Sequence, residues 1–152
     1  MSSKDDILKK LAADGMPEYP RPEADFTPQR FDDPAATFAE RLEAAGGKAV
    51  RMQPGETLDE VVRRCYPDAQ TIASVLPELT LTTLDPDSVG DPRELVDVDL
   101  GVVVGSFGVA ENGAVWIAQD LRHKALYFGA TALIVVIPNA AIVATMHEAV
   151  VR

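Results

Sequence analysis

The sequence predicts an α/β fold with a mostly parallel sheet and one β-hairpin, and three observations carry this prediction. Helical patterns and short strand patterns alternate from residue 33 onward. The run ALIVVI at 132–137 is continuous and β-branched, which is typical of a central strand covered on both faces. Asn112 and Gly113 lie between two apolar runs, and an Asn-Gly pair in that setting is the strongest short-range hairpin signal. Together these patterns favour alternating β and α units.

The composition fits one folded domain. The chain has 152 residues, of which 47% are hydrophobic. Its formal net charge of −10 argues against a nucleic-acid surface and against docking on an anionic membrane. No opening segment resembles a signal peptide, and no apolar run reaches the roughly 18 residues of a membrane span. We therefore expect a cytoplasmic protein.

The N-terminal part predicts a short helix followed by an extended strap. Residues 4–13 are amphipathic, and Ser3 is a suitable N-cap for a helix there. Five prolines within 16–34 disfavour regular secondary structure in that stretch. We expect a helix and Pro-rich strap over 1–34 and an α/β domain over 35–152, which together form a single domain.

The middle of the chain predicts two helices and two strands. A helix is expected over 33–47, where a proline stands near the start and two glycines mark the end, and a short strand, KAVRM, over 48–52. A second helix is expected over 57–66, because its opening TLDE fits a capping box. TIASVL at 71–76 is the next strand. The acidic stretch 77–96, punctuated by proline and glycine, predicts a surface excursion.

The last third of the chain is the richest in strand-forming residues. The longest such stretch is 95–118, and it contains the hairpin predicted over 107–118. We expect a two-residue type I′ turn there, in which Asn112 and Gly113 both have φ > 0. AAIVATMHEAVV at 140–151 predicts a closing helix.

Glu111 is the candidate catalytic residue. It lies at the mouth of the predicted hairpin among apolar neighbours, so we expect its carboxyl group to be partly desolvated. Burial raises the pKa of a carboxyl group and makes it a usable base or nucleophile. The alternative, a turn glutamate that faces water, remains open.

A small cationic group follows the hairpin. Arg122 and His123, with the lysine after them, are suited to bind a carboxylate or a phosphate, although a solvated loop is the alternative. Asp99 occupies one face of the strand before the hairpin. It is expected either to cap a backbone or, less simply, to serve as an acid or base.

Several kinds of site find no support in the sequence. No dinucleotide, Walker, zincin or serine-hydrolase motif is present. His123 and His147 are the two histidines and lack a local metal-ligand spacing, so we expect no metal site and no cofactor. Cys65, the one cysteine, excludes an internal disulfide and lies near the apolar face of its helix, so we expect it in the core rather than as a nucleophile.

The residues from about 97 to 150 resemble the LUD domain of lactate-utilisation proteins, especially lactate-utilisation protein C. The resemblance rests on DVDLGVVVGSFGVAENGAVWIA, then Arg122, then TALIVVIPNAAIVATMHEAV. The family fold is similar to the NagB/RpiA/CoA-transferase group of three-layer α/β/α sandwiches, so that architecture is expected here. The loop QDLRHKALYFGA departs from the usual Ser-rich loop, and the family's GPS-T-ADIE segment is not found after the last helix.

The resemblance implies a catalytic or accessory role in the oxidation of L-lactate to pyruvate, beside separate iron-sulfur oxidoreductase subunits. A chain with one cysteine fits that division of labour, because it cannot hold a Cys-ligated cluster by itself. The expected ligand is a small carboxylate or a phosphorylated molecule, with Glu111 as base or polar anchor. The residues expected to bind it are Asp99, Asn112, Gly113, Arg122 and His123.

Two other functions remain as alternatives. Certain CoA transferases carry Ser-Glu-Asn-Gly on a hairpin, and their glutamate forms a glutamyl thioester with the acyl group. Glu111 is followed by Asn-Gly here but preceded by alanine, so an acyl enzyme with Glu111 as nucleophile is the second candidate. The third is a non-catalytic interaction domain. Without the family's last segment, uncovered apolar surface is expected to be buried by self-association, which predicts a homodimer.

Overall fold

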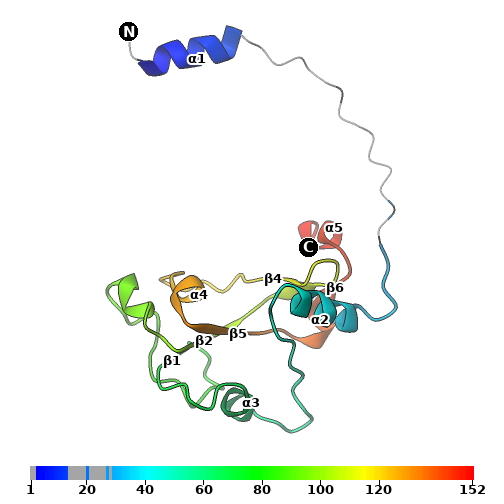
Figure 1. Ribbon diagram of the computed structural model, residues 1–152, viewed down its shortest axis with the longest axis vertical. Coiled ribbons are helices and arrows are strands. Elements are labelled where there is room, and N and C mark those ends of the chain that lie inside the picture. Colours follow the sequence, from blue (N-terminus) through cyan, green and yellow to red (C-terminus); the bar gives the residue numbers. More distant parts are fainter. Residues whose placement is uncertain (1–2, 14–19, 21–26, 28) are drawn as a thin grey trace.

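The chain has the mixed α/β architecture that the sequence predicts. A computed structural model describes residues 3–13, 20, 27 and 29–152 (Figure 1). Three strands form a parallel sheet in the order β1-β2-β5, with bounds Ile72–Ala73, Leu100–Val104 and Ala132–Val136. A second sheet has the order β4-β3-β6, with bounds Ala114–Trp116, Phe107–Val109 and Ile142–Val143.

The two sheets follow one another along the chain. β2 leads into β3 and β5 leads into β6, and both pairs, β2 with β5 and β3 with β6, are parallel. The ladder continues past β6, where the amide of Ala110 donates to the carbonyl of Val143 at 2.9 Å and that of Glu111 to Ala144 at 3.0 Å. Two segments, residues 100–109 (the β2–β3 path) and residues 132–143 (the β5–β6 path), therefore run side by side and parallel. The predicted hairpin lies at the end of the β2–β3 path.

The core lies on both faces of the parallel sheet. On one face, under α3 (Leu58–Cys65), the buried cluster contains Val62, Ile72, Leu79, Leu100 and Val102. On the other face the cluster draws on the 3-10 helix η1 (Pro92–Leu95) and on α4 (Leu126–Gly129), and it includes Leu95, Val98, Val103, Leu121 and Leu126. Alternate residues of β2 thus enter opposite clusters, as the pleat of a strand requires.

Local capping fixes the helices that the sequence predicts. Asp33 accepts hydrogen bonds from the amides of Ala35 and Ala36, both at 3.0 Å, and so begins α2 (Pro34–Ala44). Thr57 and Glu60 form the predicted capping box at the start of α3. Both helices therefore begin within a residue or two of the predicted positions.

Helix α1 (Ser3–Ala13) stands apart from the other elements (Figure 1). It has no buried residue, and its apolar side chains Ile7 and Leu11 are 57% and 67% exposed. The predicted strap over 16–34 falls largely outside the described residues, so it stays a prediction, as does the division of the chain at residue 34.

Two strand predictions are corrected by the structure. No strand forms at 48–52, because within the described part of the chain no backbone group pairs with that segment. β5 was expected to be central, but among the strands of the described residues it pairs with β2 alone, and each of its five residues is half-exposed. The two corrections concern the same region, since Lys48–Met52 and β5 line one groove.

The predicted two-residue turn is also wrong. Four residues, 110–113, join β3 and β4, and among them Gly113 has a positive φ of 72° whereas Asn112 does not. The chain passes too close to α2 here for a side chain at Gly113, where a Cβ would lie 2.5 Å from the backbone nitrogen of Leu42. Asn112 instead accepts a hydrogen bond from the amide of Ala114 at 3.0 Å.

The predicted closing helix is shorter than expected. Ile142 and Val143 form β6 because they pair with Gly108 and Val109 of β3. The helix α5 (Met146–Val150) follows, with Thr145 as its N-cap. Tertiary pairing here overrides the helical pattern of 140–151.

Candidate functional site

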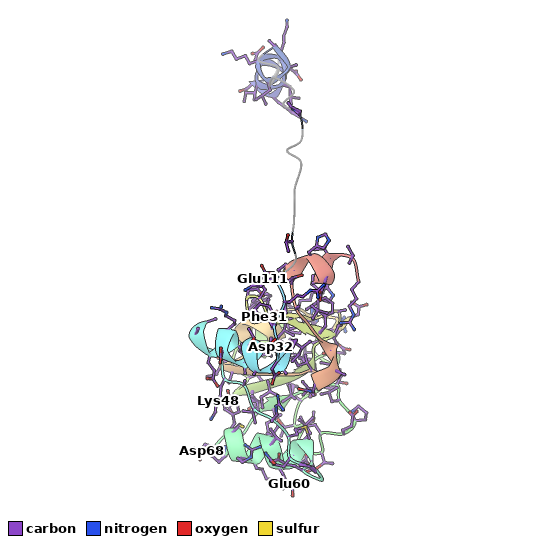
Figure 2. The ribbon with its side chains drawn as sticks, turned by 90° about the vertical axis from the view of Figure 1, so that its right-hand side faces the viewer. Phe31, Asp32, Lys48, Glu60, Asp68 and Glu111 are labelled. Atoms are coloured by element: carbon purple, nitrogen blue, oxygen red, sulfur yellow. The ribbon has the colours of Figure 1, made fainter. Side chains whose placement is uncertain are left out.

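Glu111 acts as a cap for α5 rather than as a half-buried carboxylate. Its side chain is exposed at the hairpin, and its Oε2 accepts a hydrogen bond from the amide of Met146 at 2.8 Å (Figure 2). Nearby, Glu148 Oε2 accepts from the amide of Ala144 at 3.0 Å and Thr145 Oγ1 from the amide of Glu148 at 3.3 Å. The expected desolvation of Glu111 is therefore not met, because its side chain is exposed.

This geometry gives Glu111 a structural task. Its bond to Met146 joins residues 35 positions apart, so it fastens the hairpin on the β3 path to the helix that ends the β6 path. The free amides at a helix N-terminus bind carboxylates well, which explains a glutamate at this place. A catalytic role for Glu111 stays a prediction that this contact does not require.

The predicted anion site has acidic surroundings. The backbone amide of Arg122 donates to Asp87 Oδ1 at 2.8 Å, and His123 Nε2 lies 3.2 Å from the carbonyl of Val89. Burial raises the pKa of Tyr127, and the nearby Asp120 and Asp87 raise it further. These carboxylates would oppose a bound anion, and the anion site at Arg122 and His123 stays a prediction.

Asp91 belongs to the same surroundings. Its pKa is held below the ordinary value chiefly by hydrogen bonds from the side chain and the backbone of Arg93, and least by the nearby His123. Because Asp91 and Arg93 also form a salt bridge at 2.6 Å, the charges in this loop are already partly paired.

Asp99 ties two strands together at their amino ends. Its Oδ2 accepts from the amides of Thr71 at 2.8 Å and Gln70 at 2.9 Å, just before β1. The bond from Thr71, followed by that from Gln70, lowers the pKa of Asp99. Glu111 lies beyond the opposite ends of these strands. Among the described residues, no hydrogen bond or ion pair joins Asp99, Glu111 or Arg122 to one another.

The structure presents a groove that the sequence patterns did not indicate. It has a volume of about 1170 Å³ and is lined by residues of α2, the segment 46–52, α3 and β5. Its lining is mainly apolar, with Lys48 and Arg51 as exposed cations (Figure 2 labels Lys48). Neither Glu111 nor Arg122 contributes to it. The signal that could have found it is the strand-like KAVRM run, which lacks a partner.

The one cysteine belongs to this groove. Cys65 is half-exposed at the end of α3 and lines the groove. It was expected in the core, and the structure shows it only partly buried. Within the described ranges, no cluster of three or more His, Cys, Asp or Glu side chains could hold a metal ion. No helix in that part of the chain has the length and apolarity needed to cross a membrane.

The comparisons with known proteins bear on the fold. No protein-family model matches this chain, and no curated protein matches it. The crystal structure of a DUF162 family protein from Deinococcus radiodurans does match, with a TM-score of 0.70 and 20% sequence identity. The match covers 81% of this chain and 79% of the other. At this level of identity the likeness shows the fold alone, so the chain has the fold of a DUF162 family protein.

Proposed function

We propose that this chain is a LUD-type protein that serves as an accessory component in the oxidation of L-lactate to pyruvate. The single observation that carries the proposal is the structural match to a DUF162 protein, because DUF162 is the LUD-domain family. The LUD-like sequence pattern of residues 97–150 supports it independently. The three-layer NagB/RpiA/CoA-transferase-like architecture is part of the same proposal.

The accessory role follows from the residues. A chain with one cysteine does not carry an iron-sulfur cluster alone, so electrons pass through separate iron-sulfur oxidoreductase subunits. Glu111 is hydrogen-bonded as a helix cap, and no hydrogen bond among the described residues joins it to Arg122 or His123. These contacts favour binding and assembly over catalysis by Glu111. In the described part of the chain no contact favours the acyl-enzyme alternative, in which that carboxylate is the nucleophile.

The proposal is tested by growth on L-lactate. A strain of the source organism that lacks this gene should fail to grow on L-lactate and grow normally on pyruvate. The wild-type chain should restore growth, and so should Glu111→Gln, because glutamine still accepts the Met146 hydrogen bond. Normal growth of the deletion strain on L-lactate would refute the proposed pathway.

The expected small anionic ligand has its own test. Titration calorimetry with L-lactate and pyruvate on the wild-type chain and on Arg122→Ala compares the two proteins directly. A loss of affinity in Arg122→Ala would support the anion site, with Arg63→Ala as the control for the loss of an exposed cation outside the predicted site. Equal affinities would remove Arg122 from the site without affecting the growth experiment.

A further inference from the structure

β5 is an edge strand whose sequence is that of a central strand. The residues ALIVV form a continuous apolar run, which is typical of a strand with neighbours on both sides and covered faces. In the structure β5 pairs with β2 on one side, and all five residues remain half-exposed. Such a conflict between sequence pattern and structure commonly marks a functional surface.

The open edge of β5 carries unpaired backbone groups. The amide of Ala132 donates to the carbonyl of Asp99 at 3.1 Å, so Ala132 faces β2, and backbone groups alternate between the two sides of a strand. Leu133, Val135 and Ile137 therefore direct their amides and carbonyls to the open edge, where none has a backbone partner among the described residues.

The groove runs along this edge. Residues of both faces of β5 line it, Leu133 and Val135 of one face and Ile134 and Val136 of the other. A hollow over one face alone would meet only alternate residues, so the empty space lies beside the strand.

A second unpaired segment borders the same hollow. The consecutive residues Lys48–Met52 line it, and no backbone hydrogen bond from any of them occurs within the described part of the chain. This is the segment whose sequence predicts a strand. The segment 48–52 and the open edge of β5 both lack a pairing strand, and both border the same groove.

We propose that this groove binds one extended strand of a partner polypeptide, which pairs with the outer edge of β5 on one side and with segment 48–52 on the other. A helix is a poorer occupant, because it would cover the free amides of Leu133 and Val135 without bonding them, and a buried amide without a hydrogen-bond partner is destabilising. An extended segment satisfies these groups, as in other cases of strand addition to a sheet edge.

The lining defines the chemistry of the partner strand. Phe38, Val61 and Cys65 form apolar walls, so the side chains that face α2 and α3 are apolar. Lys48 and Arg51 are exposed cations of the lining, and neither is in an ion pair among the described residues. The partner strand therefore carries an acidic residue beside its apolar run. The inference goes beyond the lactate role and does not depend on it.

A synthetic peptide tests the proposal on the full chain. The probe is a capped nine-residue peptide that begins with two aspartates and continues with alternating valine and threonine. Its control is the same peptide in which every second amide along the chain is N-methylated, so that the amides of one edge cannot donate hydrogen bonds. All side chains are kept. Hydrogen exchange by NMR follows the amides of Leu133, Val135 and Ile137, and the rate of Cys65 alkylation by N-ethylmaleimide follows the filling of the groove.

The expected result is at least a tenfold slowing of exchange at those three amides with the first peptide and none with the methylated one. Cys65 alkylation should slow in parallel. Three results would overturn the proposal: no binding at millimolar peptide, equal protection of Cys65 by both peptides without slower exchange, or slow exchange in the free protein. The last would mean that segment 48–52, α1 or a second copy already covers the edge of β5, and of these three only a second copy makes the slowing depend on protein concentration.

Protein variants give a second measurement. Val50→Pro removes one free amide of the groove and should weaken the peptide about tenfold, whereas Val50→Ala keeps the amide and serves as the matched control. Lys48→Glu with Arg51→Glu should weaken the aspartate peptide and strengthen a peptide with lysines in place of the aspartates. Unchanged affinities in Val50→Pro would remove segment 48–52 from the pairing. Unchanged affinities in the charge-reversed protein would contradict the acidic character of the partner.

Discussion

β2 and β5 have similar sequences and occupy different environments. β2 reads LGVVV and is buried except at its last residue, between β1 and β5. β5 reads ALIVV and is half-exposed throughout, with β2 as its neighbour. The comparison shows that a continuous apolar run indicates a strand whose two faces are both suited to burial. The number of strands that pair with it depends instead on residues far away in sequence.

The largest expected effect is on the free energy of unfolding, and it compares a leucine of β2 with a leucine of β5. Leu100→Ala on β2 should lower the free energy of unfolding by about 3 kcal/mol, because Leu100 is 0% exposed and its removal leaves a cavity. Leu133→Ala on β5 should cost only about 1 kcal/mol, because that side chain is half-exposed and its site can relax. Urea denaturation of both variants measures the difference. Equal losses would indicate that the edge of β5 is covered in solution.

The junction after β2 is expected to give the next largest effect. A Cβ added at Gly105 would lie 2.6 Å from side-chain carbons of both Ile137 and Val115, so Gly105→Ala should cost about 2 kcal/mol through overpacking. Gly90→Ala is the control, because a Cβ there has no neighbour within 4 Å, and it should change stability by no more than about 0.5 kcal/mol. Thermal and urea unfolding of the pair would show whether β2 and the chain after β5 approach as closely as the structure indicates. A Gly105→Ala protein as stable as Gly90→Ala would contradict that approach.

Local features of the fold were predictable from sequence because neighbouring residues determine them. The capping box of Thr57 and Glu60 and the glycine needed at position 113 are of this kind. The strand predicted at 48–52 failed because a strand exists only with a partner, and no local pattern reports whether one is present.

The candidate site was harder to predict for the same reason. The apolar residues beside Glu111 in sequence do not bury it, because a four-residue loop turns its carboxylate to Met146, 35 residues away. The positive charge of Arg122 was visible in sequence, whereas Asp87, which is brought to it from a distant loop, was not. Residues that are distant in sequence therefore determine both the exposure of Glu111 and the charge around Arg122.

A smaller effect on stability is expected at the amino ends of β1 and β2, which Asp99 joins through its hydrogen bonds to Thr71 and Gln70. The pKa of Asp99 is lowered by the amides of Thr71 and Gln70, so its ionised form stabilises the fold. That stabilisation is complete above its ordinary pKa of 3.8 and is lost as the pH falls through the lower folded value. Asp99→Asn should therefore be less stable than wild type at pH 7, and the difference between their urea midpoints should shrink as the pH falls below 3.8. A difference that is constant with pH would contradict this origin.

The smallest expected effect tests whether the β2–β3 and β5–β6 paths stay joined at their far end. Glu111→Ala removes the acceptor of the Met146 amide and should cost at most about 1 kcal/mol, with faster hydrogen exchange at Met146. Glu111→Gln keeps an acceptor oxygen, so it should retain most of the stability and the slow exchange. If the glutamine variant is as stable as wild type but fails to support growth on L-lactate, the carboxylate has a chemical role beyond the cap. If it also restores growth, the hydrogen bond that joins the hairpin to α5 is sufficient to explain the presence of Glu111 there.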